Sequence, residues 1–319
     1  MTLQLLTENL TNPALLFFVL GILAALLKSD LEIPANSSKF ISLYLLFAIG
    51  FKGGQSLSHE SLTAEVLGLM GLAILLSLLI PLYSFFILRQ KLSVYDAGAI
   101  AAAYGSVSAV TFVTAASYLE SHQQGFHGYM VAIMALMEAP AIIVGLLLIS
   151  RFSQDNDNRV GKKKTLVHAF TNGSVLLLLG SLCIGFLADV RQAEGIKPFT
   201  NDLFKGFLAI FLLDMGLSSG KNVKAFFRYG YFPLAFALFM PLFNGCVAAV
   251  LSSCCTVDAS NRFMMAVLAA SASYIAVPAT LKISVPRADP GLFIPMALAV
   301  TFPVNITLGL PLYFYMAGV

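Results

Sequence analysis

Charged residues are scarce in this chain of 319 residues, at 11%, whereas 58% of its residues are hydrophobic. A soluble domain carries about 25% charged residues. No soluble core could bury this much apolar surface. The first twelve residues contain no Lys or Arg, which is atypical of a cleavable signal peptide. The first apolar span is therefore expected to remain in the mature protein.

Chemical motifs are also sparse. The four cysteines have neither metal-ligand spacing nor the pattern of a secreted disulfide framework, and the four histidines fall in connections. The chain has no phosphate loop, nucleophile elbow or dinucleotide motif. Nothing here supports ATP-driven transport or an enzyme, and no cofactor or metal other than a coupling ion is predicted. The net charge of +3 fits a membrane protein and predicts no nucleic-acid partner.

Ten apolar spans are long enough to cross, or nearly cross, a lipid bilayer, because a crossing helix needs about 20 residues. These spans are 13–28, 38–54, 63–88, 94–119, 127–151, 173–189, 203–219, 229–256, 259–283 and 290–317. The sequence therefore predicts an all-α polytopic membrane protein with ten transmembrane helices.

The distribution of basic residues predicts the orientation of these spans. Most of the 19 Lys and Arg residues lie in connections that follow odd-numbered spans. The positive-inside rule places such connections in the cytoplasm. Both termini are then expected outside, in a multi-pass protein of the plasma (inner) membrane.

The chain repeats its own polar interruptions. Ser106 and Ser108 interrupt the fourth span, and Ser271 and Ser273 interrupt the ninth, 165 residues later. Five spans in each half reverse the orientation of the second half, so the duplication predicts two inverted repeats, as in secondary transporters. The expected boundaries are 1–152 for the first repeat, 153–170 for a cytoplasmic linker and 171–319 for the second repeat.

The interruptions suggest an anion site. Gly and Ser permit a helix to unwind, and the N-terminus of the half-helix that follows carries unpaired N–H donors and a positive dipole end. Ser hydroxyls add further donors, although small residues at a break also serve tight helix packing alone. The predicted substrate-binding residues are Gly105, Ser106, Ser108, Thr111, Ser271, Ser273 and Tyr274.

Ionisable residues inside the spans are further candidates, because charge is costly at that depth. Glu138, close to Pro140, suits a sodium ligand, a proton carrier, a support for the broken helix, or a protonated structural group. Thr301 and Asn305 sit near the matching position of the second half and offer neutral oxygen ligands for sodium. Two more residues, Lys52 and Asp214, are candidates for a gate, although Lys52 can also extend to the membrane interface.

An ordered series of motifs resembles the SbtA-type sodium-dependent bicarbonate transporters of cyanobacteria, with this chain as a divergent member. The series comprises Gly105–Thr111, Met137–Ala141, Ser271–Lys282 and Pro286–Pro290. The resemblance implies a gate portion from spans 1, 2, 6 and 7, and a core portion from spans 3–5 and 8–10 with broken helices in spans 4 and 9. It also implies a homotrimer, sodium as the coupling ion and control by a cytoplasmic PII-like regulator.

Two positions depart from the family pattern. Tyr274 stands where the family carries an Asp directly after the serines of the second break, and Val110 replaces a Ser in the first. The leading expectation is uptake of bicarbonate by sodium symport. The alternatives are transport of another small anion or carboxylate, sodium–proton exchange, and a membrane sensor that binds ligand without transport.

Overall fold

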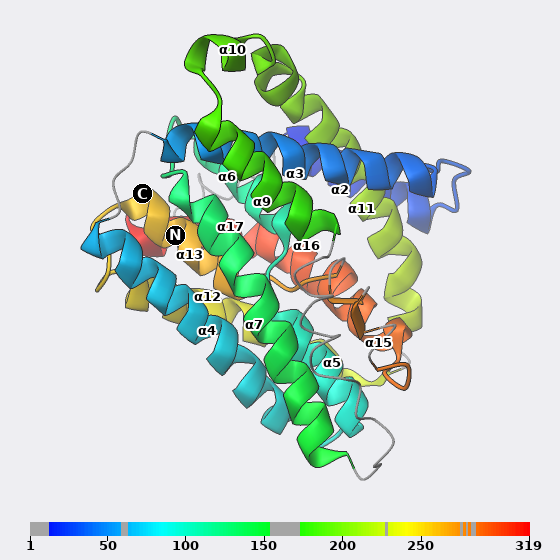
Figure 1. Cartoon of the computed structure of the whole chain (residues 1–319). Coiled ribbons are helices and arrows are strands. Elements are labelled where there is room, and N and C mark those ends of the chain that lie inside the picture. The colour runs from blue at the N-terminus through cyan, green and yellow to red at the C-terminus, as the bar shows by residue number, and fades with distance from the viewer. Residues whose placement is uncertain are drawn as a thin grey trace.

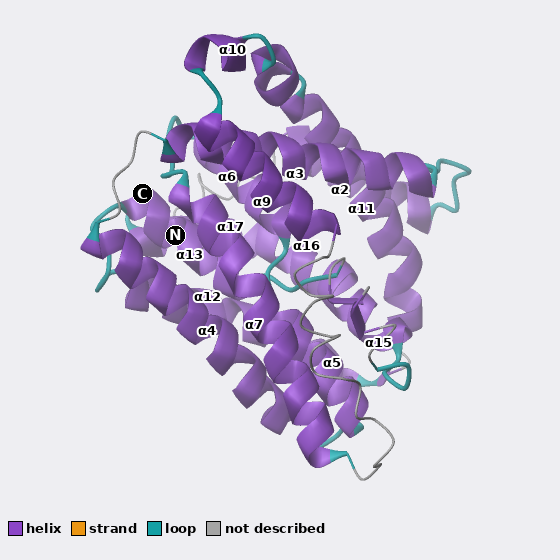
Figure 2. Cartoon of the chain, viewed as in Figure 1, coloured by secondary structure: helices purple, strands orange, loops and turns teal. Residues whose placement is uncertain are grey.

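A computed structural model describes residues 13–58, 63–153, 173–226, 229–274, 277–278, 280–281 and 285–319. All regular structure in these ranges is helical (Figure 2), as the composition predicted. Of the predicted linker at 153–170, only Ser153 lies inside the described ranges.

The helices follow the predicted spans closely. Before the linker, the elements are α2 (Pro13–Leu26), α3 (Ala35–Leu57), α4 (Ala64–Leu88), α5 (Val94–Gly105), α6 (Ala109–Ser121) and α7 (Tyr129–Phe152). After it come α9 (Gly173–Leu187), α10 (Val190–Glu194), η1 (Pro198–Asp202), α11 (Phe204–Phe226), α12 (Tyr231–Ser252) and α13 (Ala259–Ala270). The chain ends in α15 (Pro290–Pro295), η3 (Met296–Thr301), α16 (Phe302–Val304), η4 (Asn305–Gly309) and α17 (Leu310–Ala317).

Seven helical segments of the described chain are long and apolar enough to cross a membrane. They are Ala35–Leu57, Ala64–Leu88, Val94–Ser121, Tyr129–Phe152, Pro198–Lys221, Tyr231–Ser252 and Pro290–Ala317. Two shorter apolar helices, Leu16–Leu26 and Leu176–Leu187, accompany them. The last long segment contains the wide π-type turns η3 and η4, next to Pro295 and Pro303, and proline removes helical N–H donors.

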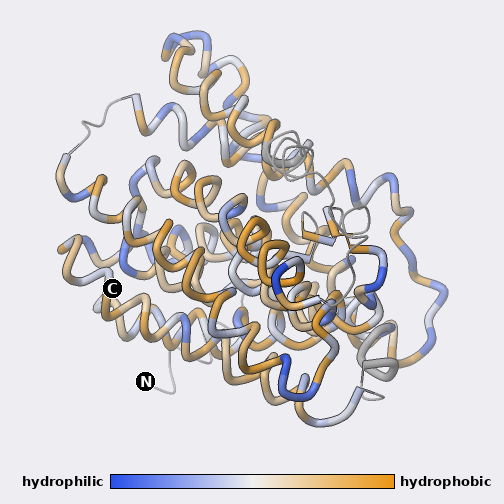
Figure 3. Tube along the Cα trace, turned by 60° about the horizontal axis from the view of Figure 1, so that its bottom comes forward, coloured by the Kyte–Doolittle hydropathy of each residue, from blue (hydrophilic) through white to orange (hydrophobic). Residues whose placement is uncertain are grey.

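Large apolar side chains cover the outside of these helices. Leu67 of α4, Leu176 of α9 and Phe239 of α12 are each more than 60% exposed. Figure 3 shows apolar residues along the helices and polar residues concentrated in the turns. Such a surface is unfavourable in water and favourable in lipid, so the chain is a multi-pass membrane protein.

Four helices, α2, α3, α9 and α11, pack in two close pairs on one side of the remaining helices (Figure 1). In the α2–α11 pair, a Cβ built on Gly21 would lie 2.2 Å from the Leu213 carbonyl oxygen, and one on Gly216 would lie 2.1 Å from the Phe18 carbonyl oxygen. Only glycine permits this approach of two backbones. The α3–α9 pair has the same reciprocal arrangement, between Gly54 and Gly185.

The other helices form a second group in which α4, α5 and α7 pack together, as do α12, α13 and α17. Tyr83 of α4 donates a hydrogen bond to the Asn244 side chain of α12, which ties the two halves together. Between the two groups, Phe18 of α2 meets Phe302 of α16 edge to face, with ring centres 5.4 Å apart. The helix breaks lie where these groups meet.

Candidate anion-binding site

The first break separates α5 from α6. The last residue of α5, Gly105, lies so close to Pro81 of α4 that an added Cβ would be 2.4 Å from the proline Cδ. The chain is then extended at Ser106 and Ser108. Ser108 caps α6, because its Oγ accepts a hydrogen bond from the Thr111 N–H at 3.2 Å. The break therefore ends in a capped helix N-terminus inside the protein.

The second break follows α13. Residues 271–274 are not helical. The Ser273 Oγ accepts a hydrogen bond from the Val277 N–H at 3.4 Å, and residues 277–278 are helical. In each break, a serine hydroxyl therefore accepts a hydrogen bond from a backbone N–H three or four residues later.

The two breaks are joined by direct hydrogen bonds. The Ser108 N–H donates to Ser271 Oγ at 2.9 Å, and the Ser273 N–H donates to the Ala103 carbonyl at 2.8 Å. Ser271 Oγ in turn donates to the Leu268 carbonyl at 2.8 Å. All three serines are at least 96% buried, so the breaks form one connected polar unit in an apolar interior.

Several donors in this unit have no acceptor. The N–H groups of Ala109 and Val110, in the first turn of α6, make no hydrogen bond within the described part of the chain. The Ser106 Oγ is buried and also has no partner there. Unpaired N–H groups at a helix N-terminus attract negative charge.

A cavity of about 40 Å³ adjoins these donors. Its lining residues are Ser42, Leu46, Val107, Ser108, Ala109, Val110, Met134, Glu138, Leu178, Ser273 and Tyr274. A single water needs roughly 10–15 Å³ on the same kind of measure. The cavity therefore suits a few waters or a small inorganic ion, and its lining includes no Lys or Arg.

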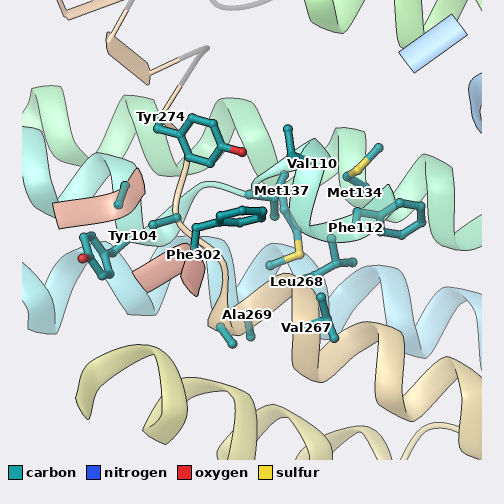
Figure 4. Close-up of a cluster of buried hydrophobic side chains, with 14 of the residues drawn as sticks. Tyr104, Val110, Phe112, Met134, Met137, Val267, Leu268, Ala269, Tyr274 and Phe302 are labelled. Carbon is teal, nitrogen blue, oxygen red and sulfur yellow. The ribbon is translucent and has the colours of Figure 1, made fainter. Parts of the chain in front are cut away.

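A cluster of buried apolar side chains supports the breaks (Figure 4). Tyr274 packs edge to face on Phe302, with ring centres 6.1 Å apart. Figure 4 shows its hydroxyl directed toward Val110, on the α6 side of the cavity. That hydroxyl is buried close to Ser108, without a well-formed hydrogen bond in the described part of the chain. It is thus a further polar group available to a bound ion.

Comparison with known protein families identifies the family of the chain. The model of the Na+-dependent bicarbonate transporter superfamily matches residues 13–318. The chain belongs to this superfamily. The resemblance noted from the sequence motifs is thereby confirmed, and the protein is a transporter and not an enzyme. Among curated proteins, no similar sequence was found.

The structure of this superfamily member brings four predicted site residues into one cavity, namely Ser108, Glu138, Ser273 and Tyr274. The other four predicted substrate-binding residues lie in or next to the breaks but do not line the cavity. Gly105 packs on Pro81 and Ser271 bridges the breaks, while Ser106 and Thr111 are buried beside them.

The two neutral residues predicted as sodium ligands lie away from the cavity and have protein partners. Thr301 donates to the Ala237 carbonyl at 2.9 Å and is hydrogen-bonded to the Tyr104 hydroxyl at 2.7 Å. Asn305 donates to the Ala270 carbonyl at the end of α13, at 2.7 Å. Thr301 thus connects α5, which ends at the first break, with α12, whereas Asn305 bonds to the end of α13 at the second break.

The two gate candidates also lie apart from the cavity. Lys52 of α3 places its ammonium group 5.6 Å from the centre of the Phe204 ring. Asp214 of α11 is buried and accepts a hydrogen bond from Ser38, in the first turn of α3. Both residues therefore connect α3 with α11, whose first residue is Phe204.

Besides the two breaks and α7, helices α3 and α9 also line the cavity, through Ser42 and Leu46 of α3 and Leu178 of α9. The sequence did not predict these residues. The half-buried Ser42 makes no side-chain hydrogen bond in the described part of the chain. No polar break or charge marks these residues in the sequence. Only the packing of α3 and α9 against the breaks shows their place.

Proposed function

We propose that the protein takes up bicarbonate by secondary active transport with sodium as the coupling ion, and that the anion binds in the cavity beside the two breaks. The observation that carries this proposal is the pair of N–H groups at Ala109 and Val110, for which the described residues provide no acceptor. Ala109 and Val110 line the same cavity as Ser108, Ser273 and Tyr274. Bicarbonate is small and singly charged, and it has oxygen acceptors that suit such donors.

Glu138 supports the sodium part of the proposal. Glu138 lines the same cavity, and no Lys or Arg is among the lining residues. An ionised carboxylate and an anion a few ångströms apart repel strongly in a poorly solvated site. A sodium ion between them removes that repulsion and makes binding of the anion depend on sodium. Oxygen ligands such as the Glu138 carboxylate and the Ser hydroxyls are also those that hard cations accept.

The helix packing supports ten spans in two inverted repeats. Span 1 packs closely on span 7 (α2–α11). In a repeat of five spans, span 6 corresponds to span 1 and span 2 to span 7, so span 6 should pack on span 2 in the same way. That second close pair, α9–α3, is present. One glycine follows this exchange, because Gly21 in span 1 corresponds to Gly185 in span 6, 164 residues later, and each makes a close contact with the backbone of the paired helix. We infer that the second half repeats the first in inverted orientation.

We infer, further, that α2, α3, α9 and α11 form the gate portion and the remaining spans the core portion. The cavity lies between them, with Ser42 and Leu178 on the gate side and Ser108 and Ser273 on the core side. Relative movement of the two portions would then expose the cavity to each side of the membrane in turn. The family resemblance supports a homotrimer in the plasma membrane with both termini outside, and a PII-like regulator on the cytoplasmic side.

The test is uptake of labelled bicarbonate into proteoliposomes that contain the purified full-length chain. We expect uptake to require an inward sodium gradient and to fall to the level of empty liposomes when choline replaces sodium. Uptake that is equal in choline would remove the coupling. Uptake of a small carboxylate in preference to bicarbonate would change the substrate, and sodium-driven proton movement without anion uptake would indicate exchange. Binding of bicarbonate without flux would indicate a sensor.

A further inference from the structure

A guanidinium group sits on a cluster of three phenylalanine rings at the end of α4. The Arg89 guanidinium carbon lies 4.3 Å from the ring centre of Phe152, 5.6 Å from that of Phe85 and 5.8 Å from that of Phe86. The three rings pack on one another with centres 5.5–5.7 Å apart. Aromatic faces attract cations, so the rings hold the Arg89 side chain in place.

A second guanidinium group approaches the same cluster from α7. The Arg151 guanidinium carbon lies 5.8 Å from the Phe152 ring centre. In the described part of the chain, neither Arg89 nor Arg151 forms an ion pair or donates a side-chain hydrogen bond. A guanidinium that rests on a ring by its face keeps the N–H donors at its edge for another acceptor. Both cations therefore lie near one ring, with side-chain donors that no group in the described ranges uses.

The helix surface around Arg89 and Arg151 suits a lipid headgroup. Both α4 and α7 are long enough to cross the membrane, lie side by side and end here (Figure 1). Leu82, Phe86 and Leu147 are 41%, 43% and 45% exposed within the last turns of these helices. The exposed apolar surface of these two helices thus ends at the two cations. If α4 and α7 span the bilayer, their ends reach the level of the lipid phosphate groups.

We propose that Arg89 and Arg151 bind the phosphate of an anionic phospholipid in the leaflet where α4 and α7 end, with its acyl chains on the surface around Phe86 and Leu147. Guanidinium edges match the oxygen atoms of a phosphate in a bidentate manner. The lipid would bridge the ends of two core helices, one of which carries Glu138. The proposed topology places this leaflet on the cytoplasmic side. The site is separate from the transport cavity and does not depend on the transported anion.

The test compares the full-length wild type with the double variant Arg89→Gln/Arg151→Gln in detergent. The matched control is Arg191→Gln/Lys197→Gln, which removes two exposed basic residues in and after α10. Phosphatidylglycerol and phosphatidylcholine with identical acyl chains are titrated, and bound lipid is counted by native mass spectrometry. We expect wild type and control to retain phosphatidylglycerol selectively, and each removed charge at the site to weaken retention roughly fivefold. A rise of a few degrees in melting temperature should accompany retention.

The outcomes are distinct. Equal retention of phosphatidylglycerol by the double variant and the wild type would overturn the proposal. Equal protection by soluble glycerol phosphate would show a phosphate site that needs no lipid, and would also overturn it. If the double variant does not fold, Arg89→Lys takes its place, because Lys keeps the charge and loses the planar fork. Unchanged retention by Arg89→Lys would then exclude a site built on the stacked guanidinium.

Discussion

The backbone N–H of Ser108 donates a hydrogen bond to the hydroxyl of Ser271, 2.9 Å away and 163 residues later in the chain. Each residue belongs to one of the two helix breaks, and both are buried. Since Ser271 Oγ also donates to Leu268, its hydroxyl is already used within the protein. Ser273 has a different position, because it lines the cavity. The two serines of the second break therefore have different expected roles.

Alanine substitution should separate these roles. Ser273→Ala should raise the apparent KM for bicarbonate about tenfold or more, because a hydrogen bond to a charged group contributes about 1.5–3 kcal/mol. Its melting temperature should fall less than that of Ser271→Ala, because the bond that Ser273 Oγ accepts from the Val277 N–H is long, at 3.4 Å. Ser271→Ala should lower the melting temperature, because the buried Ser108 N–H loses its acceptor at a cost of about 1–3 kcal/mol. Uptake kinetics and thermal unfolding in detergent measure the two effects.

Ser252→Ala is the matched control for this pair. Ser252 is fully buried and donates to the Ala249 carbonyl at 3.0 Å, a bond of the same kind as that of Ser271 to Leu268, but it does not line the cavity. Its KM should stay at the wild-type value. A wild-type KM for Ser273→Ala as well would place the anion elsewhere.

Glu138→Gln tests the origin of the sodium requirement. Gln keeps the shape and a carbonyl oxygen but removes the charge. If the carboxylate holds sodium beside the anion, the sodium concentration for half-maximal uptake should rise at least severalfold and the maximal rate should fall. Glu120→Gln is the control, because Glu120 forms an exposed ion pair with Lys205 at 3.3 Å, and such pairs contribute little. Superimposable sodium curves for Glu138→Gln and the wild type would leave Glu138 a structural role only.

Ser42→Leu tests whether the cavity is the transport site. Ser42 is the polar side chain that α3 contributes to the cavity wall. A leucine there would occupy much of a space of about 40 Å³ and remove a hydroxyl. We expect uptake to fall at least tenfold while the protein still folds. Ser37→Leu introduces the same side chain at an exposed position of the same helix and should leave uptake unchanged. Wild-type uptake by Ser42→Leu would exclude this cavity.

The sequence predicted the helical class and the positions of the breaks well, for a physical reason. Segments that cross lipid must hydrogen-bond their backbone polar groups internally, as helices do. The lengths of the apolar runs and their polar interruptions therefore indicate the helices and the breaks directly. Ser108 and Ser273 were predicted as ligands because a serine in a run of small apolar residues serves either helix packing or polar binding; both line the cavity, and their role as ligands stays a prediction. Glu138 stood out because an ionisable residue at that depth is rare.

The partners of these residues could not be predicted in the same way. Ser42 and Leu178 reach the cavity only because α3 crosses α9 closely, and that crossing depends on tertiary packing between distant segments. Asn305 matched a ligand by chemistry, yet its side chain donates to the Ala270 carbonyl. A sequence pattern shows which groups need partners, but it does not show which partner the fold supplies.

The close glycine contacts allow a test of the helix pairs themselves. A Cβ on Gly216 of α11 would lie 2.1 Å from the Phe18 carbonyl oxygen, whereas one on Gly206 of the same helix would meet no atom within 4 Å. Because the obstructing atom belongs to the backbone of α2, Gly216→Ala must move the two helices apart. Overpacking of this kind costs about 1–3 kcal/mol or more, so the melting temperature in detergent should fall by several degrees. Gly206→Ala should instead leave it unchanged or raise it slightly, because alanine restricts the unfolded chain by about 0.4–1 kcal/mol. Equal melting temperatures for the two variants would contradict the close α2–α11 pair, and with it one of the two contacts that support the inverted repeat.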